Sequence, residues 1–119
     1  MPGMSIHVVD VSCGVVAAGM AVEVYALGAD GAARREIASG ALGNTGTLAD
    51  PRLGATFAPG QYEAVFHVAD YYRKAGLALP AVPFLEVVTY RFGISDASQH
   101  YHLPFKCTPW GFSCFRGGA

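Results

Sequence analysis

Charged side chains are scarce in this sequence, and their charges nearly cancel. Asp, Glu, Lys and Arg make up 14% of the 119 residues, and the formal net charge is −1 at pH 7. Binding to nucleic acid or to an anionic membrane is therefore not expected, because both depend on clustered positive charge. Hydrophobic residues make up 52%, which leaves too few charges to cover a lone monomer. We expect an oligomer that hides apolar faces between its subunits.

Long apolar runs are also missing. No stretch is long enough to span a membrane, and the first residues contain no signal-peptide pattern. Only three cysteines are present, an odd number in a chain without an export signal. We therefore expect a cytoplasmic protein whose Cys107 and Cys114 lie close together as thiols, not as a disulfide. The length predicts a single domain over residues 1–119.

The most informative pattern lies near the C-terminus, where residues alternate with period two. One face of this predicted strand is apolar and suited to a core, and it consists of Tyr101, Leu103, Phe105 and Cys107. The other face carries His100, His102, Pro104 and Lys106. A strand face in contact with solvent more often carries Thr, Lys and Glu. Two imidazoles and an ammonium in line therefore indicate a face that meets a ligand.

Similar alternation predicts most of the remaining structure. Further strands are expected at 5–11, 20–27, 34–39, 61–68, 86–94 and 112–115. One short helix is expected at 70–76, beginning at Ala69 or Asp70 and ending at Gly76. Seven or eight short strands with a single helix predict an all-β protein with the architecture of a β-sandwich.

Three segments of the sequence resemble the transthyretin family, in particular its enzymatic branch, the 5-hydroxyisourate hydrolases. They are His7-Val8-Val9-Asp10, the segment 57–62 that leads to Ala69-Asp70-Tyr71-Tyr72, and the tail with His100-Tyr101-His102-Leu103-Pro104 and Pro109-Trp110-Gly111-Phe112-Ser113-Cys114-Phe115-Arg116-Gly117. The resemblance implies a transthyretin-like β-sandwich of seven or eight strands with one short helix. It also implies a homotetramer, a dimer of dimers with a ligand channel between the dimers, that binds a small-molecule substrate and needs no cofactor.

The resemblance also indicates site residues. These hydrolases use a histidine on the first strand, an arginine after an Asp-Gly turn, the second histidine of a His-Tyr-His motif and a terminal Tyr-Arg-Gly-Ser. His7 and His102 match the two histidines. Thr47 takes the position of the arginine, and Gly118 takes that of the final serine. Arg52, five residues beyond Thr47, is a candidate replacement for the arginine if the loop is rearranged.

Three further tail residues have alternative interpretations. Lys106 stands where the family usually has an apolar channel residue, and we expect it to hold a carbonyl oxygen or to act as an amine nucleophile. The alternative is that its side chain reaches solvent at the channel mouth. Ser113 either donates a hydrogen bond into the channel or satisfies the tail backbone. Arg116 is expected to pair with Asp10 or Glu23.

A zinc site is a weaker alternative. His100 and His102 lie two residues apart on one strand face, and His7 or Cys114 would complete a ligand set. The resemblance implies no metal, and no acidic or cysteine ligand has a diagnostic spacing. We therefore expect no metal and place His100 among the substrate-binding candidates.

The leading hypothesis is a divergent enzyme of the hydroxyisourate hydrolase type, acting on another small cyclic carbonyl compound, including one of specialised metabolism. His7 and His102 would move protons in a ring-opening hydrolysis, or in a related cyclisation, elimination or rearrangement. Lys106 and Thr47 would hold a carbonyl oxygen as charge develops on it. One alternative is authentic 5-hydroxyisourate hydrolysis in purine breakdown. The other is a non-catalytic carrier like transthyretin, which two titrating histidines disfavour.

Overall fold

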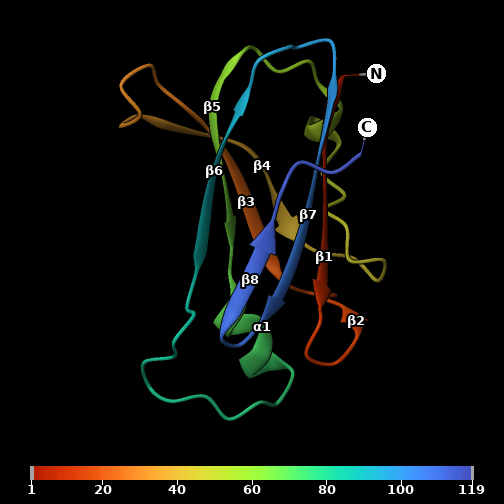
Figure 1. Cartoon of the computed structure of the whole chain (residues 1–119), viewed down its shortest axis with the longest axis vertical. Coiled ribbons are helices and arrows are strands. Elements are labelled where there is room, and N and C mark those ends of the chain that lie inside the picture. The colour runs from red at the N-terminus through yellow and green to blue at the C-terminus, as the bar shows by residue number, and fades with distance from the viewer. Residues whose placement is uncertain (1, 119) are drawn as a thin grey trace.

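Two four-stranded β-sheets pack face to face in the computed structural model, which describes residues 2–118 (Figure 1). The strand order is β2-β1-β7-β8 in one sheet and β4-β3-β5-β6 in the other. The elements are β1 (Gly3–Asp10), β2 (Val15–Val16), β3 (Ala21–Leu27), β4 (Arg34–Ala41), η1 (Pro51–Gly54), β5 (Gly60–Phe66), α1 (Val68–Lys74), β6 (Val88–Ile94), β7 (His100–Thr108) and β8 (Gly111–Cys114). The expectation of an all-β sandwich with one short helix is confirmed.

The helix begins earlier than the sequence predicts. α1 starts at Val68, and the extended stretch ends at Phe66 instead of continuing to Val68. The residue before the helix is His67, so the predicted start at Ala69 or Asp70 is wrong. Val68 is fully buried, as the alternation requires, but it reaches the core from the first helical turn. Burial alone does not distinguish a strand end from a helix start.

The core forms where the inner faces of the two sheets meet. Ile6 and Val8 of β1 and Leu103 and Phe105 of β7 are almost completely buried. The ring of Phe105 stacks on Phe66 of the opposite sheet, with 3.9 Å between ring centroids and 6° between planes. Each such buried side chain contributes about 1.5–3 kcal/mol to the free energy of unfolding. The residues of β1 and β7 that lie between these buried side chains therefore point to the outer face of their sheet.

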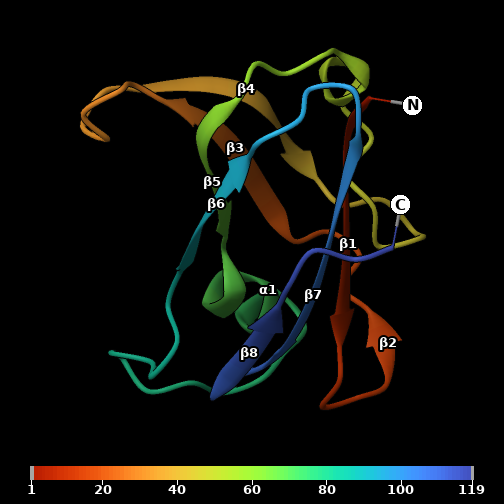
Figure 2. The same ribbon diagram turned by 45° about the horizontal axis from the view of Figure 1, so that its top comes forward.

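β1 and β7 are parallel neighbours, although the residues that pair lie 97 positions apart in the sequence, as from Gly3 to His100 (Figure 2). Ser5 pairs with His102, His7 with Pro104, and Val9 with Lys106. Directly paired residues of adjacent strands point to the same side of a sheet. The register therefore gathers the outward side chains of both strands into one continuous surface.

Two cysteines lie on the inner face of the same sheet. Cys107 is buried and Cys114 is half-buried, and both are free thiols. Burial raises the pKa of each thiol to about 11, so both are protonated at neutral pH. They pack as small apolar side chains, with Cys114 opposite Phe105 across the β7–β8 pair.

α1 closes the end of the sandwich nearest the β7–β8 turn. Its Tyr72 hydroxyl donates to Asp10 Oδ1 at 2.7 Å, and its Tyr71 hydroxyl donates to Asp10 Oδ2 at 3.3 Å. Ser12 donates to the same carboxylate through its backbone N–H and its hydroxyl. A single buried carboxylate thus joins the helix to the end of β1. No helix within residues 2–118 is both long and apolar enough to cross a membrane.

Candidate active site

The outer face of β1 and β7 brings three of the four histidines together. We call this surface the histidine face, and it comprises Ser5, His7, His100, His102, Pro104 and Lys106. Along β7, each of these residues alternates with a buried neighbour, so that His100 and His102 are half-buried and Lys106 is exposed. His7 is half-buried in the same way on β1. The outward direction predicted for His100, His102, Pro104 and Lys106 is confirmed.

His7 and His102 are diagonal neighbours on this face. His102 pairs with Ser5, two residues before His7, which sets the two Cα atoms roughly 8 Å apart. The pKa of His102 lies below the ordinary histidine value, because burial disfavours its charged form and because His100 and His7 would add positive charge nearby. At neutral pH His102 is therefore a neutral imidazole, which is the form that accepts a proton.

Ser5 connects two of the histidines, and sequence analysis missed it. Its Oγ lies 2.6 Å from Nδ1 of His102 and 2.8 Å from Nε2 of His100. The sequence did contain one indication of its position, because Ser5 lies two residues before His7 and therefore on the same strand face. That indication becomes meaningful only once the register of β1 against β7 is known.

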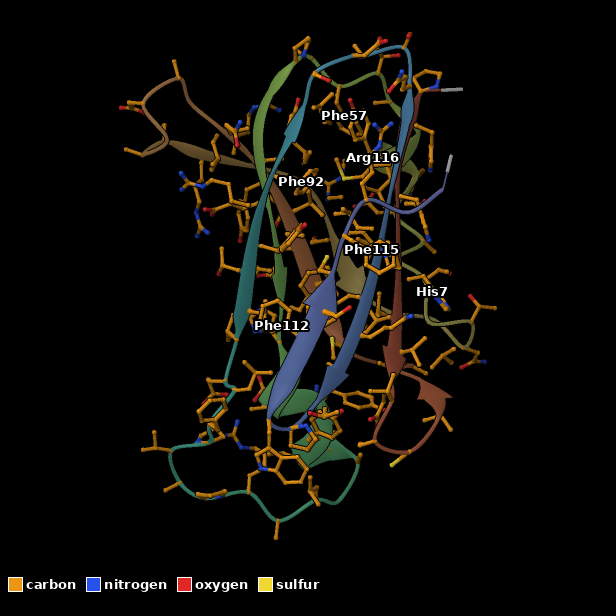
Figure 3. All side chains as sticks on the ribbon, viewed as in Figure 1. His7, Phe57, Phe92, Phe112, Phe115 and Arg116 are labelled. Carbon is orange, nitrogen blue, oxygen red and sulfur yellow. The ribbon has the colours of Figure 1, made fainter. Side chains whose placement is uncertain are left out.

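Thr47 lies directly beside His7. An isolated antiparallel bridge pairs the two residues, and Val8 N–H donates to the Gly46 carbonyl oxygen at 2.9 Å. This approach needs glycine at position 46, because φ is +76° and a Cβ would lie 2.8 Å from the Val8 carbonyl oxygen. Figure 3 shows His7 on β1 facing the yellow loop that follows β4. The structure thus brings Thr47, which hydrogen-bonds Thr45 through its hydroxyl at 2.7 Å, to the histidine face.

Lys106 and Ser113 extend this surface toward β8. They pair across β7 and β8, so Ser113 also points outward. Lys106 pairs with Val9, two residues beyond His7, which makes it a diagonal neighbour of His7 on the side away from His102. Its Nζ lies 5.9 Å from the centroid of the Phe115 ring, within reach of a cation–π interaction.

Arg52 lies elsewhere. Its guanidinium donates to Asp50 at 2.8 Å and approaches Glu36 at 3.6 Å. It lines a cavity of about 470 Å³ together with Phe57 and Tyr62, and no residue of the histidine face takes part in that lining. The structure does not bring Arg52 together with His7 and His102, so it offers no support for Arg52 as a replacement for the family's arginine.

The C-terminal tail crosses β7 at His102. The Gly117 N–H donates to the His102 carbonyl oxygen at 2.7 Å. Arg116 holds the tail by donating to the side chain of Gln99 and the carbonyl oxygen of His100, and its guanidinium lies 3.9 Å from the Tyr101 ring centroid. The predicted pairing of Arg116 with Asp10 or Glu23 is therefore wrong. Figure 3 labels Phe115 and Arg116, the first tail residues beyond the end of β8.

Gly117 is expected to tolerate no side chain without moving His102. A Cβ at this position would lie 2.7 Å from His102 Cδ2 and 3.2 Å from Pro104 Cδ, whereas a Cβ on Gly118 would meet nothing within 4 Å. Gly117→Ala should displace the His102 ring or lift the tail, and should shift the His102 Cδ2–Hδ2 resonance in ¹H–¹³C NMR spectra. Gly118→Ala is the matched control and should leave that resonance in place. An unshifted resonance in Gly117→Ala would contradict the close packing of the tail on His102.

The described residues contain no evident metal site. Within 2–118, no group of three or more His, Cys, Asp or Glu side chains is arranged to hold a metal ion. Cys114 cannot join His100 and His102 as a ligand, because it lies on the inner face of the sheet.

Comparison with known proteins places the chain among enzymes. The sequence profile of the HIUase/Transthyretin family matches residues 4–117. A protein of Rhizobium meliloti named 5-hydroxyisourate hydrolase 2 is 44% identical over 96% of this chain and 94% of its own length. A 5-hydroxyisourate hydrolase of Ralstonia nicotianae is 37% identical over 98% of this chain and 99% of its own length.

Solved structures agree with these sequence relatives. The 5-hydroxyisourate hydrolase of Klebsiella pneumoniae has a TM-score of 0.79 and 25% identity, covering 99% of this chain and all of that one. A crystal structure of (S)-allantoin synthase has a TM-score of 0.87 and 31% identity over 98% of this chain. This chain spans only 43% of the length of that protein.

Proposed function

Because the chain belongs to the HIUase/transthyretin family, we propose that it is a hydrolase that opens the ring of 5-hydroxyisourate. Relatives that bear this name match nearly the whole chain. The observation in the structure that supports the proposal best is the pair of outward histidines, His7 and His102, set side by side by the β1–β7 register. The lowered pKa of His102 suits a general base near neutral pH.

Three residues of the histidine face, together with Thr47 beside it, have roles in such a hydrolysis. His102 takes a proton from water as the water oxygen bonds to a ring carbonyl carbon. The Thr47 hydroxyl and the Lys106 ammonium stabilise the negative charge that develops on the carbonyl oxygen. The carbonyl then re-forms, the ring C–N bond breaks, and the nitrogen takes up the proton that His102 holds. His7, beside Thr47, is placed to orient the substrate and to assist this proton transfer.

A second candidate is the same chemistry on a different small cyclic carbonyl compound. The observation that favours it is Thr47, because the bridge to His7 puts a neutral hydroxyl where the resemblance implies an arginine. The relatives favour 5-hydroxyisourate itself and lend no support to altered chemistry. The carrier alternative finds no support among them either.

Freshly generated 5-hydroxyisourate tests the proposal. Urate oxidase produces the compound, and its decay is followed by ultraviolet absorbance with and without the protein. We expect the decay rate to rise in proportion to protein concentration. Decay at the spontaneous rate at every protein concentration would exclude 5-hydroxyisourate as the substrate and would leave the second candidate.

Removing the charge of Lys106 is expected to slow turnover. Lys106→Met keeps a long side chain but removes the ammonium that faces the developing oxyanion, and kcat should fall about tenfold, the equivalent of one modest charged hydrogen bond. Lys74→Met makes the same exchange on exposed α1 and should leave kcat unchanged. Wild-type kinetics in Lys106→Met would instead assign Lys106 to solvent.

A homotetramer is expected in solution. Large hydrophobic side chains remain exposed on the single chain, and they are Val11, Val15, Leu77, Val82, Phe84, Val87, Trp110, Phe112 and Phe115. Burying them between subunits would offset the low charge of the surface. Size-exclusion chromatography with light scattering should give four times the chain mass at micromolar concentration. A stable monomer would contradict the assembly and any site shared between subunits.

A further inference from the structure

We propose that Ser5 is a positioning residue that fixes the tautomer of His102, so that Nδ1 carries the proton and Nε2 is free to accept one. The kinetic consequence of this inference rests on the proposed function, whereas the tautomer itself does not. The observation that carries it is a hydrogen-bonded chain that runs from Pro2 through His100 and Ser5 to His102.

The Ser5 hydroxyl is the central link of this chain. Its oxygen lies 2.8 Å from His100 Nε2 and 2.6 Å from His102 Nδ1. A hydroxyl has one proton, so it donates to one of these nitrogens and accepts from the other. The two histidines therefore have opposite hydrogen-bonding roles toward Ser5, and the role of one determines the role of the other.

The backbone of Pro2 determines the direction of the chain. Its carbonyl oxygen lies 3.5 Å from His100 Nδ1, and a carbonyl oxygen only accepts, so this contact is a hydrogen bond only when His100 Nδ1 carries the proton. In neutral His100, Nε2 is then an acceptor and takes the hydrogen bond that Ser5 donates. Ser5 Oγ consequently accepts from His102 Nδ1–H. The remaining nitrogen of His102, Nε2, keeps an unshared electron pair.

This tautomer matters because a histidine free in water prefers the other one, with the proton on Nε2. Without Ser5, the nitrogen that must act as the base would more often be occupied. Once His102 has taken a proton from water, its Nδ1–H still donates to Ser5, so the same contact stabilises the cation. Besides His100, the charged or titratable groups around His102 are His7 on the histidine face and Arg116, which is engaged with Gln99 and Tyr101.

NMR spectroscopy of ¹⁵N-histidine-labelled protein tests the tautomer without substrate. At a pH where His102 is neutral, long-range ¹H–¹⁵N correlations should show a protonated Nδ1 and an unprotonated Nε2. Ser5→Ala should shift His102 toward the Nε2–H form, and Ser5→Thr, which restores a hydroxyl, should return it. His67, bonded to Glu23 on the other sheet, serves as an internal reference that should not change. Nε2–H in the wild type, or an unchanged tautomer in Ser5→Ala, would overturn the inference.

Kinetics supply the second readout. Ser5→Ala should lower kcat for 5-hydroxyisourate about tenfold, less than the loss of the general base itself because the imidazole of His102 remains, with KM changed less than about twofold. Ser5→Thr should recover most of that loss. Full kcat in Ser5→Ala would overturn the positioning role. If the wild type does not hydrolyse 5-hydroxyisourate, the proposed function fails, while the NMR result still decides the tautomer.

Discussion

Replacing His102 with alanine is expected to lower kcat by about 10²- to 10⁴-fold, because that is the range supplied by a positioned general base. The imidazole is half-buried on the outer face of the sheet. The β1–β7 pairing and the hydrogen bond from Gly117 N–H involve only the backbone of His102 and persist in the variant, which should therefore stay folded. His67→Ala is the matched control, since His67 lies between β5 and α1, away from the histidine face, with its ring against Glu23 of β3. Equal activity of His102→Ala and the wild type would remove His102 from the mechanism.

The pH dependence of kcat/KM should also report the role of His102 as a base. Burial and the neighbouring His100 and His7 hold the pKa of His102 below its usual 6.5. Protonated His102 cannot accept a proton, so kcat/KM should fall on the acid side with a midpoint below that value. His7→Gln removes one source of positive charge and should raise the midpoint. An acid midpoint above 6.5 in the wild type would contradict this environment.

Asp10→Ala is expected to cause the largest loss of stability, about 3 kcal/mol in the free energy of unfolding, through the removal of a buried charged acceptor. Asp10 is only 2% exposed and accepts hydrogen bonds from Ser12, Tyr71 and Tyr72. Without the carboxylate, α1 loses its polar attachment to β1. Urea unfolding at a fixed protein concentration measures the difference.

The matched control for Asp10→Ala is Asp30→Ala, in the exposed β3–β4 turn. It removes one turn hydrogen bond and should lower the free energy of unfolding by less than about 1 kcal/mol.

The contribution of Asp10 to stability should depend on pH. Burial raises the pKa of Asp10, but the hydrogen bonds from Ser12, Tyr72 and Tyr71 together hold it below its usual value. The carboxylate therefore stabilises the fold above the unfolded-state pKa, and the effect is lost as pH falls through the folded-state value. If the difference in the free energy of unfolding between the wild type and Asp10→Ala persists undiminished in acid, the Asp10 carboxylate does not stabilise the fold in this way.

The alternation of residues was sufficient to predict most strands and the faces of β7. It placed His100, His102 and Lys106 on one side and four core residues on the other, as the structure does. It did not predict that β1 and β7 are parallel neighbours, since that contact spans most of the chain. For the same reason Ser5 was missed, because its role depends entirely on which residue of β7 lies opposite.

The tail shows a different limit of sequence reasoning. Arg116 was expected to pair with a carboxylate, but Asp10 is engaged by Ser12, Tyr71 and Tyr72, and Glu23 is engaged by His67. Arg116 instead binds an amide, a carbonyl oxygen and an aromatic ring. Charge pairing in a sequence identifies possible partners, but competition among buried donors and acceptors decides between them.

A crystal structure with a bicyclic analogue of 5-hydroxyisourate that resists hydrolysis tests the central claim most directly. If the outer face of β1 and β7 is the active site, the analogue should lie over His7 and His102, with a polar atom within hydrogen-bond distance of His102 Nε2. Density for the analogue in the cavity beside Arg52 and Tyr62, with the histidine face empty, would contradict it.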